Sequence, residues 1–256
     1  MQRMRLAIAV GLLFCVGQLA ARAQESPVKC LIITGDHGHD WKGTTELLEK
    51  FLPEGGKIQV TVTKTPAKDL TPENLAKYDV LLLNYRETKP TEETKWTDAN
   101  KQALVDAVKG GKGLVVYHFA SSAFPDWDEY ERMICGGWRK QGHHGPKHKF
   151  TVKKHTSDVA KNHPISAGLS ESFEHEIDEL YANSKMVEGN EVLATAYSDP
   201  AKEKGTGKDE PMIWVNTFGK GRVYHNALGH DVQALSDPAL QEWLRRGVIW
   251  AGHGPL

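Results

Sequence analysis

The stretch "TGDHGHDW", Thr34 to Trp41, gathers two histidines and two aspartates within five residues. Imidazole and carboxylate groups bind metal ions and also move protons near neutral pH. The stretch lacks the Gly-x-Gly-x-x-Gly spacing and the Gly-Lys-Ser/Thr ending of phosphate loops. Because this short loop cannot build a metal site alone, we expect His37 and His39 to act with partners from later in the chain. We expect Asp40 to cap the following helix.

Further polar side chains follow other apolar runs of the sequence. Tyr85 and Arg86 follow "DVLLLN", and "GLVVYHF" includes Tyr117 and His118. No His-Glu-x-x-His helix or pair of cysteines gives a strong spacing signal for a metal, so any such site must be assembled from distant histidines. The remaining candidates lie in the second half of the chain: His143, His144, His175, Asp178, Glu179 and His230.

Two of these candidates are adjacent, in "EIDELY". In an extended segment Asp178 and Glu179 point to opposite faces, so only one of them easily enters a pocket while the other pairs or caps. His230 and Asp231 follow a strand and a glycine, a loop position suited to a general base. An N-cap role for Asp231 beside a surface His230 is the alternative.

Strands and helices alternate in the first half of the chain. Apolar strands are predicted at residues 28–34, 57–65, 79–85 and 113–119, with helices at 43–52, 71–78 and 97–112 between them. Thr71 is the expected N-cap of the second helix, with Pro72 at its first position. The second half is predicted to add a helix at 127–134, strands at 147–154, 191–198 and 211–228 with a turn inside the last, and a closing helix at 238–252.

Buried strands separated by helices predict a doubly wound, flavodoxin-like α/β fold with a mostly parallel sheet and additional strands in the second half. Ligands of such folds bind outside the carboxyl ends of the strands, and the polar candidates cluster after those ends. The sequence therefore predicts one site along one rim of the sheet.

A nucleophilic elbow is a second chemistry to consider at this rim. Amidotransferase-like domains place a cysteine on a tight turn from strand to helix, whereas the corresponding place here reads "VVYHFASSAF", with His118 and no cysteine. Ser121 and Ser122 lie nearby, but Gly-x-Ser-x-Gly is absent. We therefore expect no glutamine amidotransferase activity.

The N-terminus carries the pattern of a secretory signal peptide. A basic start, an apolar run at residues 6–20 and the small residues of "ARA" predict removal of residues 1–23, which leaves a single domain at 24–256. We therefore expect export to the periplasm or the medium. No later segment is apolar enough to span a membrane, so stable membrane insertion is not expected.

The net charge of the chain bears on nucleic-acid binding, and its cysteines bear on disulfide formation. The first 23 residues hold three arginines and no acidic residue, so the formal charge of −1 becomes −4 without them, which does not favour nucleic acid as a partner. Cys30 lies in an apolar run and Cys135 precedes "GG". Export permits a disulfide, but we favour two buried thiols.

The order of several motifs resembles that of ThuA-like (trehalose utilisation) proteins, of the class I glutamine amidotransferase-like superfamily. They are "ASSAFPDWDEYERMICGGW", "NHPISAGL", "FEHEIDELY", "EVLATA", "PMIWVNTFGKGRVYHNALGHD" and "EWLRRGVIWA", within residues 28 to 253. Trp138 departs from the Gly-Gly-x-Phe common in the family. The resemblance implies the same sheet without the cysteine, and a link to sugars, including 3-keto-glycosides. It carries over His118, His143 or His144, Asp178, Glu179, Tyr181, Trp214, Arg222 and His230.

Together the residues and the resemblance predict an exported enzyme that acts on a small-molecule carbohydrate by proton transfer beside a carbonyl, as an isomerase or lyase. His230 or His118 would be the base and Asp178 its orienter. Substrate contacts are expected from His37, Tyr85, Arg86, His143, Glu179, Tyr181 and Arg222. A divalent metal, zinc or similar, is expected at His39, His118, His144 and His230.

Two alternatives stay open. One is a sugar-binding module without catalysis, in which Trp127, Trp138 and Trp214 stack on sugar rings, although we favour a core position for Trp214 because it lies in a strand. The other is a metal-dependent hydrolase.

Overall fold

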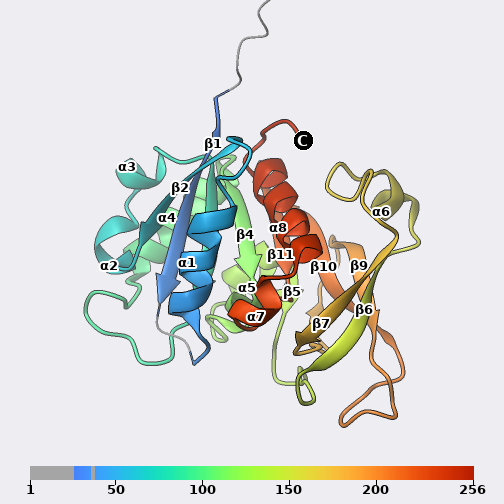
Figure 1. Cartoon of the computed structure of the whole chain (residues 1–256). Helices are drawn as coiled ribbons and strands as arrows, with labels where there is room; N and C mark the ends of the chain where they lie inside the picture. The colour runs from blue at the N-terminus through green and yellow to red at the C-terminus, as the bar shows by residue number, and fades with distance from the viewer. Residues whose placement is uncertain (1–25, 36–37) are drawn as a thin grey trace, which may run out of the picture.

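A computed structural model describes residues 26–35 and 38–256 of the chain (Figure 1). The predicted signal peptide at 1–23 and His37 lie outside these residues. A nine-stranded sheet has the order β2-β1-β3-β4-β11-β10-β9-β6-β7, and a small second sheet pairs β5 with β8. None of the described helices is long and apolar enough to cross a membrane.

Five neighbouring strands of the large sheet are parallel, which confirms the predicted α/β class. They are β2 (Ile58–Thr63), β1 (Val28–Gly35), β3 (Val80–Tyr85), β4 (Gly113–Tyr117) and β11 (Gly221–Asn226). All six residues of β3 and all five of β4 are buried, as expected for strands with helices on both faces.

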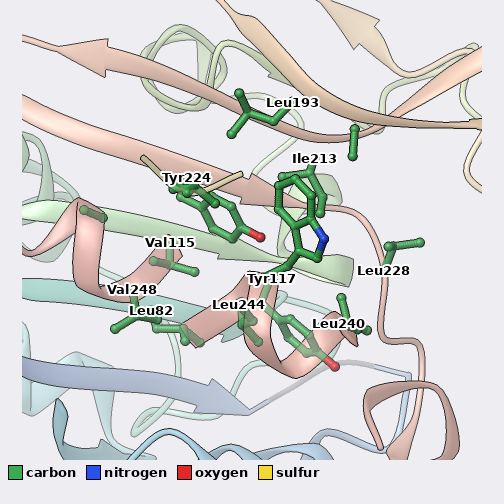
Figure 2. Packing of buried hydrophobic residues seen from close by; sticks show 14 of the residues in the cluster. Leu82, Val115, Tyr117, Leu193, Ile213, Tyr224, Leu228, Leu240, Leu244 and Val248 are labelled. Atoms are coloured by element: carbon green, nitrogen blue, oxygen red, sulfur yellow. The ribbon is translucent and has the colours of Figure 1, made fainter. Parts of the chain in front are cut away.

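Successive residues of β3 enter different cores, because side chains alternate along a strand. Leu82 packs with Val115, Tyr224, Leu244 and Val248 under α1 (Trp41–Phe51) and α8 (Pro238–Ala251) (Figure 2). Leu81 and Leu83 pack in a second core with residues of α4 (Asp98–Lys109) and α5 (Asp128–Ile134). The helices therefore cover both faces of the parallel strands.

The remaining strands of the large sheet form an antiparallel extension, which confirms that the second half adds strands. They are β10 (Asp209–Phe218), β9 (Glu191–Tyr197), β6 (His148–Lys154) and β7 (Ser172–Asp178), and the small sheet contains β5 (Gly136–Gly137) and β8 (Lys185–Met186). Short helical segments complete the chain: α2 (Pro66–Asp69), α3 (Pro72–Leu75), the 3-10 helix η1 (His118–Ser122), α6 (Asp158–Asn162) and α7 (Val232–Leu235).

The direction of β7 matters for the site. Each neighbour from β11 to β7 reverses direction, so β7 runs the same way as the parallel strands and its carboxyl end lies at the same edge. In a flat sheet, four strand spacings of about 4.8 Å would keep the ends of β7 and β11 about 19 Å apart. The extension curls instead, and α7 lies between α1 and β7 (Figure 1).

Several local expectations are confirmed. Asp40 caps α1 by accepting from the Gly43 backbone N–H, and Thr71 caps α3 ahead of Pro72. Cys30 and Cys135 are both buried and free. Asp231 is the N-cap of α7, the alternative left open for it.

Candidate functional site

His118 occupies the turn where amidotransferase-like domains carry their cysteine. It follows β4 and has φ of +42°, a left-handed conformation that costs a residue with a side chain about 1–3 kcal/mol. Its ring is buried, with Nδ1 2.7 Å from the Ala227 carbonyl and Nε2 3.0 Å from the Tyr181 hydroxyl. Because only a protonated Nδ1 can donate to a carbonyl, Nε2 of the neutral ring accepts from the Tyr181 hydroxyl.

Three histidines and a carboxylate meet beside this turn. One ligand atom from each of His39, His118, Glu179 and His230 lies within 4.8 Å of all the others. Glu179 Oε2 is 3.0 Å from His230 Nδ1, and 3.8 Å from the Nε2 atoms of both His39 and His118. These residues follow β1, β4, β7 and β11, so the cluster lies at the predicted rim.

His144 approaches the cluster from the loop that precedes β6. Its Nε2 is 3.4 Å from Glu179 Oε1, while its Nδ1 lies 2.7 Å from the Gly145 carbonyl. If Nδ1 donates to that carbonyl, Nε2 carries the lone pair that faces the carboxylate. A lone pair and a carboxylate repel each other, so a cation between them would stabilise this arrangement.

The charges inside the cluster are stabilised by one another. Burial raises the pKa of Glu179, but the nearby His230, His144 and His39 outweigh burial and lower it below its usual value. Burial lowers the pKa of His230, and Glu179 overcomes this effect and raises it. The two side chains thus form an ion pair, although His230 Nδ1 and Glu179 Oε2 are not aligned as a hydrogen bond.

Asp178 holds the site together without entering it. Its buried carboxylate accepts the backbone N–H groups of Glu179 at 2.8 Å, Gly229 at 2.7 Å and His230 at 3.1 Å. Asp178 was predicted to orient the base, His230 or His118, and it reaches His230 through the backbone N–H and not through the ring. Asp178 orients the His230 backbone, and it is Glu179 that contacts the imidazole.

Behind Asp178 lies a buried histidine between two acids. His175 places Nε2 2.8 Å from Asp178 Oδ2 and Nδ1 2.8 Å from Asp237 Oδ2. Both ring nitrogens must donate, so His175 carries a positive charge. Burial acts to lower its pKa, but the two carboxylates prevail and raise it from 6.5 to about 9. His175 is thus an internal cation rather than a metal ligand.

A β-bulge explains why sequence periodicity does not reveal this network. His175 and Asp178 are three residues apart and would point to opposite faces of a regular strand. Opposite them on β6, Phe150 and His148 are only two residues apart, so β7 accommodates an extra residue. The bulge brings both side chains to the same buried side.

Several predicted substrate contacts lie away from the cluster. Tyr85 is fully buried in the core on the α4 side, where its hydroxyl donates to the Thr94 carbonyl, so its predicted role as a contact is contradicted. Arg222 lies at the amino end of β11, where it bonds the Trp250 carbonyl. Four residues of about 3.3 Å separate it along the strand from the rim end, Asn226, so its predicted role is also contradicted.

Of the remaining predicted substrate contacts, some lie at the site and one turns away from it. His143 turns toward the Lys204 carbonyl, 3.2 Å from its Nε2, which leaves His144 as the member of the pair near Glu179. Tyr181 lies at the site through its bond to His118. Arg86 lies at its border, with its guanidinium 4.9 Å from the centre of the Phe119 ring.

The three tryptophans considered for sugar stacking differ in whether they lie in the core or border the site. Trp214 is fully buried against His225, with ring centres 3.6 Å apart, which confirms the core position. Trp127 packs on Phe124 and Tyr130. Trp138 is partly exposed and lies 4.5 Å from the Tyr181 ring, so it is the one of the three that borders the site.

The sheet order and the histidine at the elbow define an α/β protein of the flavodoxin-like, class I glutamine amidotransferase-like type without the amidotransferase nucleophile. The ThuA family model, described as trehalose utilisation, matches residues 29–251. The chain therefore belongs to the ThuA family, which links it to carbohydrate utilisation.

Solved structures agree with this assignment. A ThuA-like protein from Parabacteroides merdae is 27% identical with a TM-score of 0.76, over 88% of this chain and 90% of that one. A ThuA-like protein from Bacteroides uniformis is 20% identical with a TM-score of 0.71, over 91% and 94%. A β-galactosidase from Bacillus circulans is 15% identical with a TM-score of 0.54, over 88% of this chain but 31% of the enzyme, and shares the fold alone. Comparison with curated proteins gave no match.

The charged His175 should make stability depend on pH. His175→Gln leaves two buried carboxylates without their cation, so we expect a loss of about 3–5 kcal/mol in the free energy of unfolding at pH 6. Because the pKa is raised by folding from 6.5 to about 9, this contribution is complete below pH 6.5 and is lost as the pH rises through about 9. Urea unfolding of both proteins from pH 6 to pH 10 measures it.

His148→Gln, on the partly exposed face of β6, is the matched control and should stay within about 0.5 kcal/mol of the parent protein. A stability difference between the parent and His175→Gln that does not shrink between pH 6.5 and pH 10 would contradict a charged His175.

Proposed function

We propose that this chain is a divalent-metal-dependent enzyme of carbohydrate utilisation that moves a proton beside a sugar carbonyl, as an isomerase or lyase. One observation carries the proposal: ligand atoms of His39, His118, Glu179 and His230 come from four distant segments to within 4.8 Å of one another. Family membership supports the sugar as substrate class.

The residue types fit a divalent ion of the zinc type. Three imidazole nitrogens and one carboxylate oxygen are a common ligand set for such ions. In tetrahedral zinc sites neighbouring ligand atoms lie about 3.3 Å apart. The measured separations from Glu179 Oε2, between 3.0 and 3.8 Å, bracket that value.

The surroundings of the ligands also fit a metal site. Metal-binding histidines usually donate their other ring N–H to a carbonyl or carboxylate, which fixes the tautomer. His118 does so at Ala227. Asp178 fixes the backbone of His230 and Glu179, so two ligands are positioned before any ion binds. The preformed arrangement reduces the cost of ordering the site.

A bound divalent ion would supply a Lewis acid that polarises a sugar carbonyl and stabilises the enediolate oxygen. If His118 and His230 serve as ligands, neither is available as the base. His144 then remains, because its Nε2 faces the site at the rim with a side chain that is 35% exposed. Tyr181 stays protonated, since burial raises its pKa well above the usual value. An ion bound at His118 Nε2 would take the place of the Tyr181 hydrogen bond to that atom, and the hydroxyl could then donate to a substrate oxygen.

The reaction balances without a redox partner. A 3-keto group acidifies the neighbouring C2–H bond, and His144 takes that proton while the electron pair moves into the enediolate. Reprotonation at another carbon gives isomerisation. Alternatively, the C1–O bond breaks, a C1=C2 double bond forms and the leaving oxygen takes up a proton. A metal-dependent hydrolase would use the same ligands, but it would leave C2–H intact.

The first test is metal content. Protein purified without chelator and dialysed should retain about one zinc-type ion per chain by elemental analysis. Glu179→Gln and His39→Ala each remove a ligand, so we expect metal affinity to fall at least about 100-fold. His253→Asn changes an exposed histidine near the C-terminus and should bind metal as the parent does. Failure to retain any of zinc, cobalt or manganese would rule out the metal centre.

The second test is proton transfer itself. We expect the metal-loaded protein to exchange C2 hydrogen of 3-keto-trehalose or a 3-keto-glucoside for deuterium, followed by nuclear magnetic resonance in D₂O. Removing the base by His144→Gln should slow exchange about 10²–10⁴-fold while metal content stays unchanged. Release of a keto-sugar that keeps its C2–H would favour the hydrolase, whereas a product with a C1=C2 double bond would favour the lyase. Neither exchange nor product would reject both enzymes.

Export is part of the same proposal. The basic start, apolar run and small residues of the first 23 positions support cleavage after Ala23. We expect the secreted or periplasmic protein to begin at Gln24 when the gene is expressed in a bacterial host. Intact-mass measurement of the fractionated protein checks this, and a full-length protein confined to the cytoplasm would refute it.

A further inference from the structure

A cleft lies near the histidine cluster. This cleft has a volume of about 600 Å³ and lies between the turn after β3, the end of η1 and the segment at residues 138–141. Arg86, Ser122, Trp138, Arg139, Lys140 and Lys185 are among its lining residues. No part of the cleft is used by the chemistry described above.

Two side chains connect the cleft to the cluster. Arg86 lies 4.9 Å from the centre of the Phe119 ring, and the same ring contacts His39, at 4.0 Å between centres. Trp138 contacts Tyr181, whose hydroxyl bonds His118.

The cleft is positively charged. Four of its lining residues are cationic and two, Asp126 and Glu131, are acidic. Glu131 accepts from both Arg139, at 2.8 Å, and Lys185, so these three side chains together keep one positive charge. Asp126 offsets one of the other two cations, and the lining has a net charge of +2, four cations less two acids. Arg86 and Lys140 are the lining cations that form no ion pair among the described residues.

The two arginines differ in how firmly they are held. Arg139 is 9% exposed and donates to Glu131, to the Ser121 carbonyl at 2.8 Å and to the Trp138 carbonyl at 2.7 Å, so it shapes the wall. Arg86 makes only long hydrogen bonds, 3.5 Å to the Ser122 carbonyl and 3.4 Å to Thr88, among the residues of the described ranges. Its guanidinium can exchange these weak bonds for a ligand at little cost.

We infer that this cleft binds an anionic substituent of the substrate carbohydrate, a carboxylate, sulfate or phosphate, with Arg86 as the principal contact and Lys140 as the second. Guanidinium groups pair with such anions through two parallel hydrogen bonds, which adds geometric specificity. A neutral sugar offers no group that would compensate the charge. The inference deepens the proposed function by naming a substrate class, acidic or otherwise anionic sugars, whose reacting carbon lies at the histidines.

Binding to metal-free protein tests the cleft apart from catalysis. After removal of metal with chelator, calorimetry at low ionic strength compares glucose with glucuronate, glucose 6-sulfate and glucose 6-phosphate, and with inorganic sulfate. We expect at least one anionic sugar to bind at least tenfold more tightly than glucose and than inorganic sulfate. The tightest of the three identifies the anion.

Variants then assign the contact. Arg86→Gln should weaken the anionic sugar at least tenfold and leave glucose unchanged, and Lys140→Gln should weaken it several-fold. Arg132→Gln removes an exposed arginine of α5 that does not line the cleft, and should change nothing. Lys140 is exposed, so its variant reports on binding even if Arg86→Gln folds poorly.

Equal binding of glucose and all three anionic sugars would overturn the inference, as would unchanged affinity in both Arg86→Gln and Lys140→Gln. Inorganic sulfate that binds as tightly as the best sugar would reduce the cleft to an ion site and overturn it as well. Anion binding without any metal binding would instead refute the metal centre and leave the cleft standing, so the two failures are distinguishable.

Discussion

The site depends on one buried carboxylate. Asp178 ends the edge strand β7, yet it binds the loop after β11, which lies four positions away in the sheet order. Its four donors, three backbone N–H groups and the charged His175, satisfy the carboxylate in a place where an unpaired charge would cost several kcal/mol. The strongest interaction near the site is thus structural, and it brings the antiparallel extension against the parallel half.

The same loop supports the strained elbow. The loop runs from Ala227 to His230, and Ala227 accepts from His118 while Gly229 accepts from the Tyr117 hydroxyl. Gly229 has φ of +101°, and a Cβ there would lie 2.5 Å from the Tyr117 hydroxyl oxygen, so only glycine fits. The ends of β4 and β7 therefore both bind this loop, β4 through Tyr117 and His118, and β7 through Asp178. His118 and His230 lie close together because the loop is bonded to both strand ends.

Some of this was predictable from residue order. Strand ends of a doubly wound sheet meet at one rim, so His39, His118 and His230 could be grouped without coordinates. Two predicted substrate contacts lie elsewhere: the same rule suggested Tyr85, and the family resemblance suggested Arg222. Tyr85 is the last residue of its strand, but its side chain points to the core face, and Arg222 begins β11 instead of ending it. The sheet face on which a side chain lies and the strand end at which it stands both depend on strand register. Apolar runs in the sequence do not specify that register.

Local periodicity and residue order were sufficient to predict the α/β class, the family, the helix caps at Asp40 and Thr71, and the histidines that follow the parallel strands. Coordinates were needed to show which of Asp178 and Glu179 enters the pocket, that His144 rather than His143 lies near Glu179, and that His175 is an internal cation. These directions depend on a bulge in β7 and on the curl of the antiparallel strands, and both arise from packing between segments far apart in the chain.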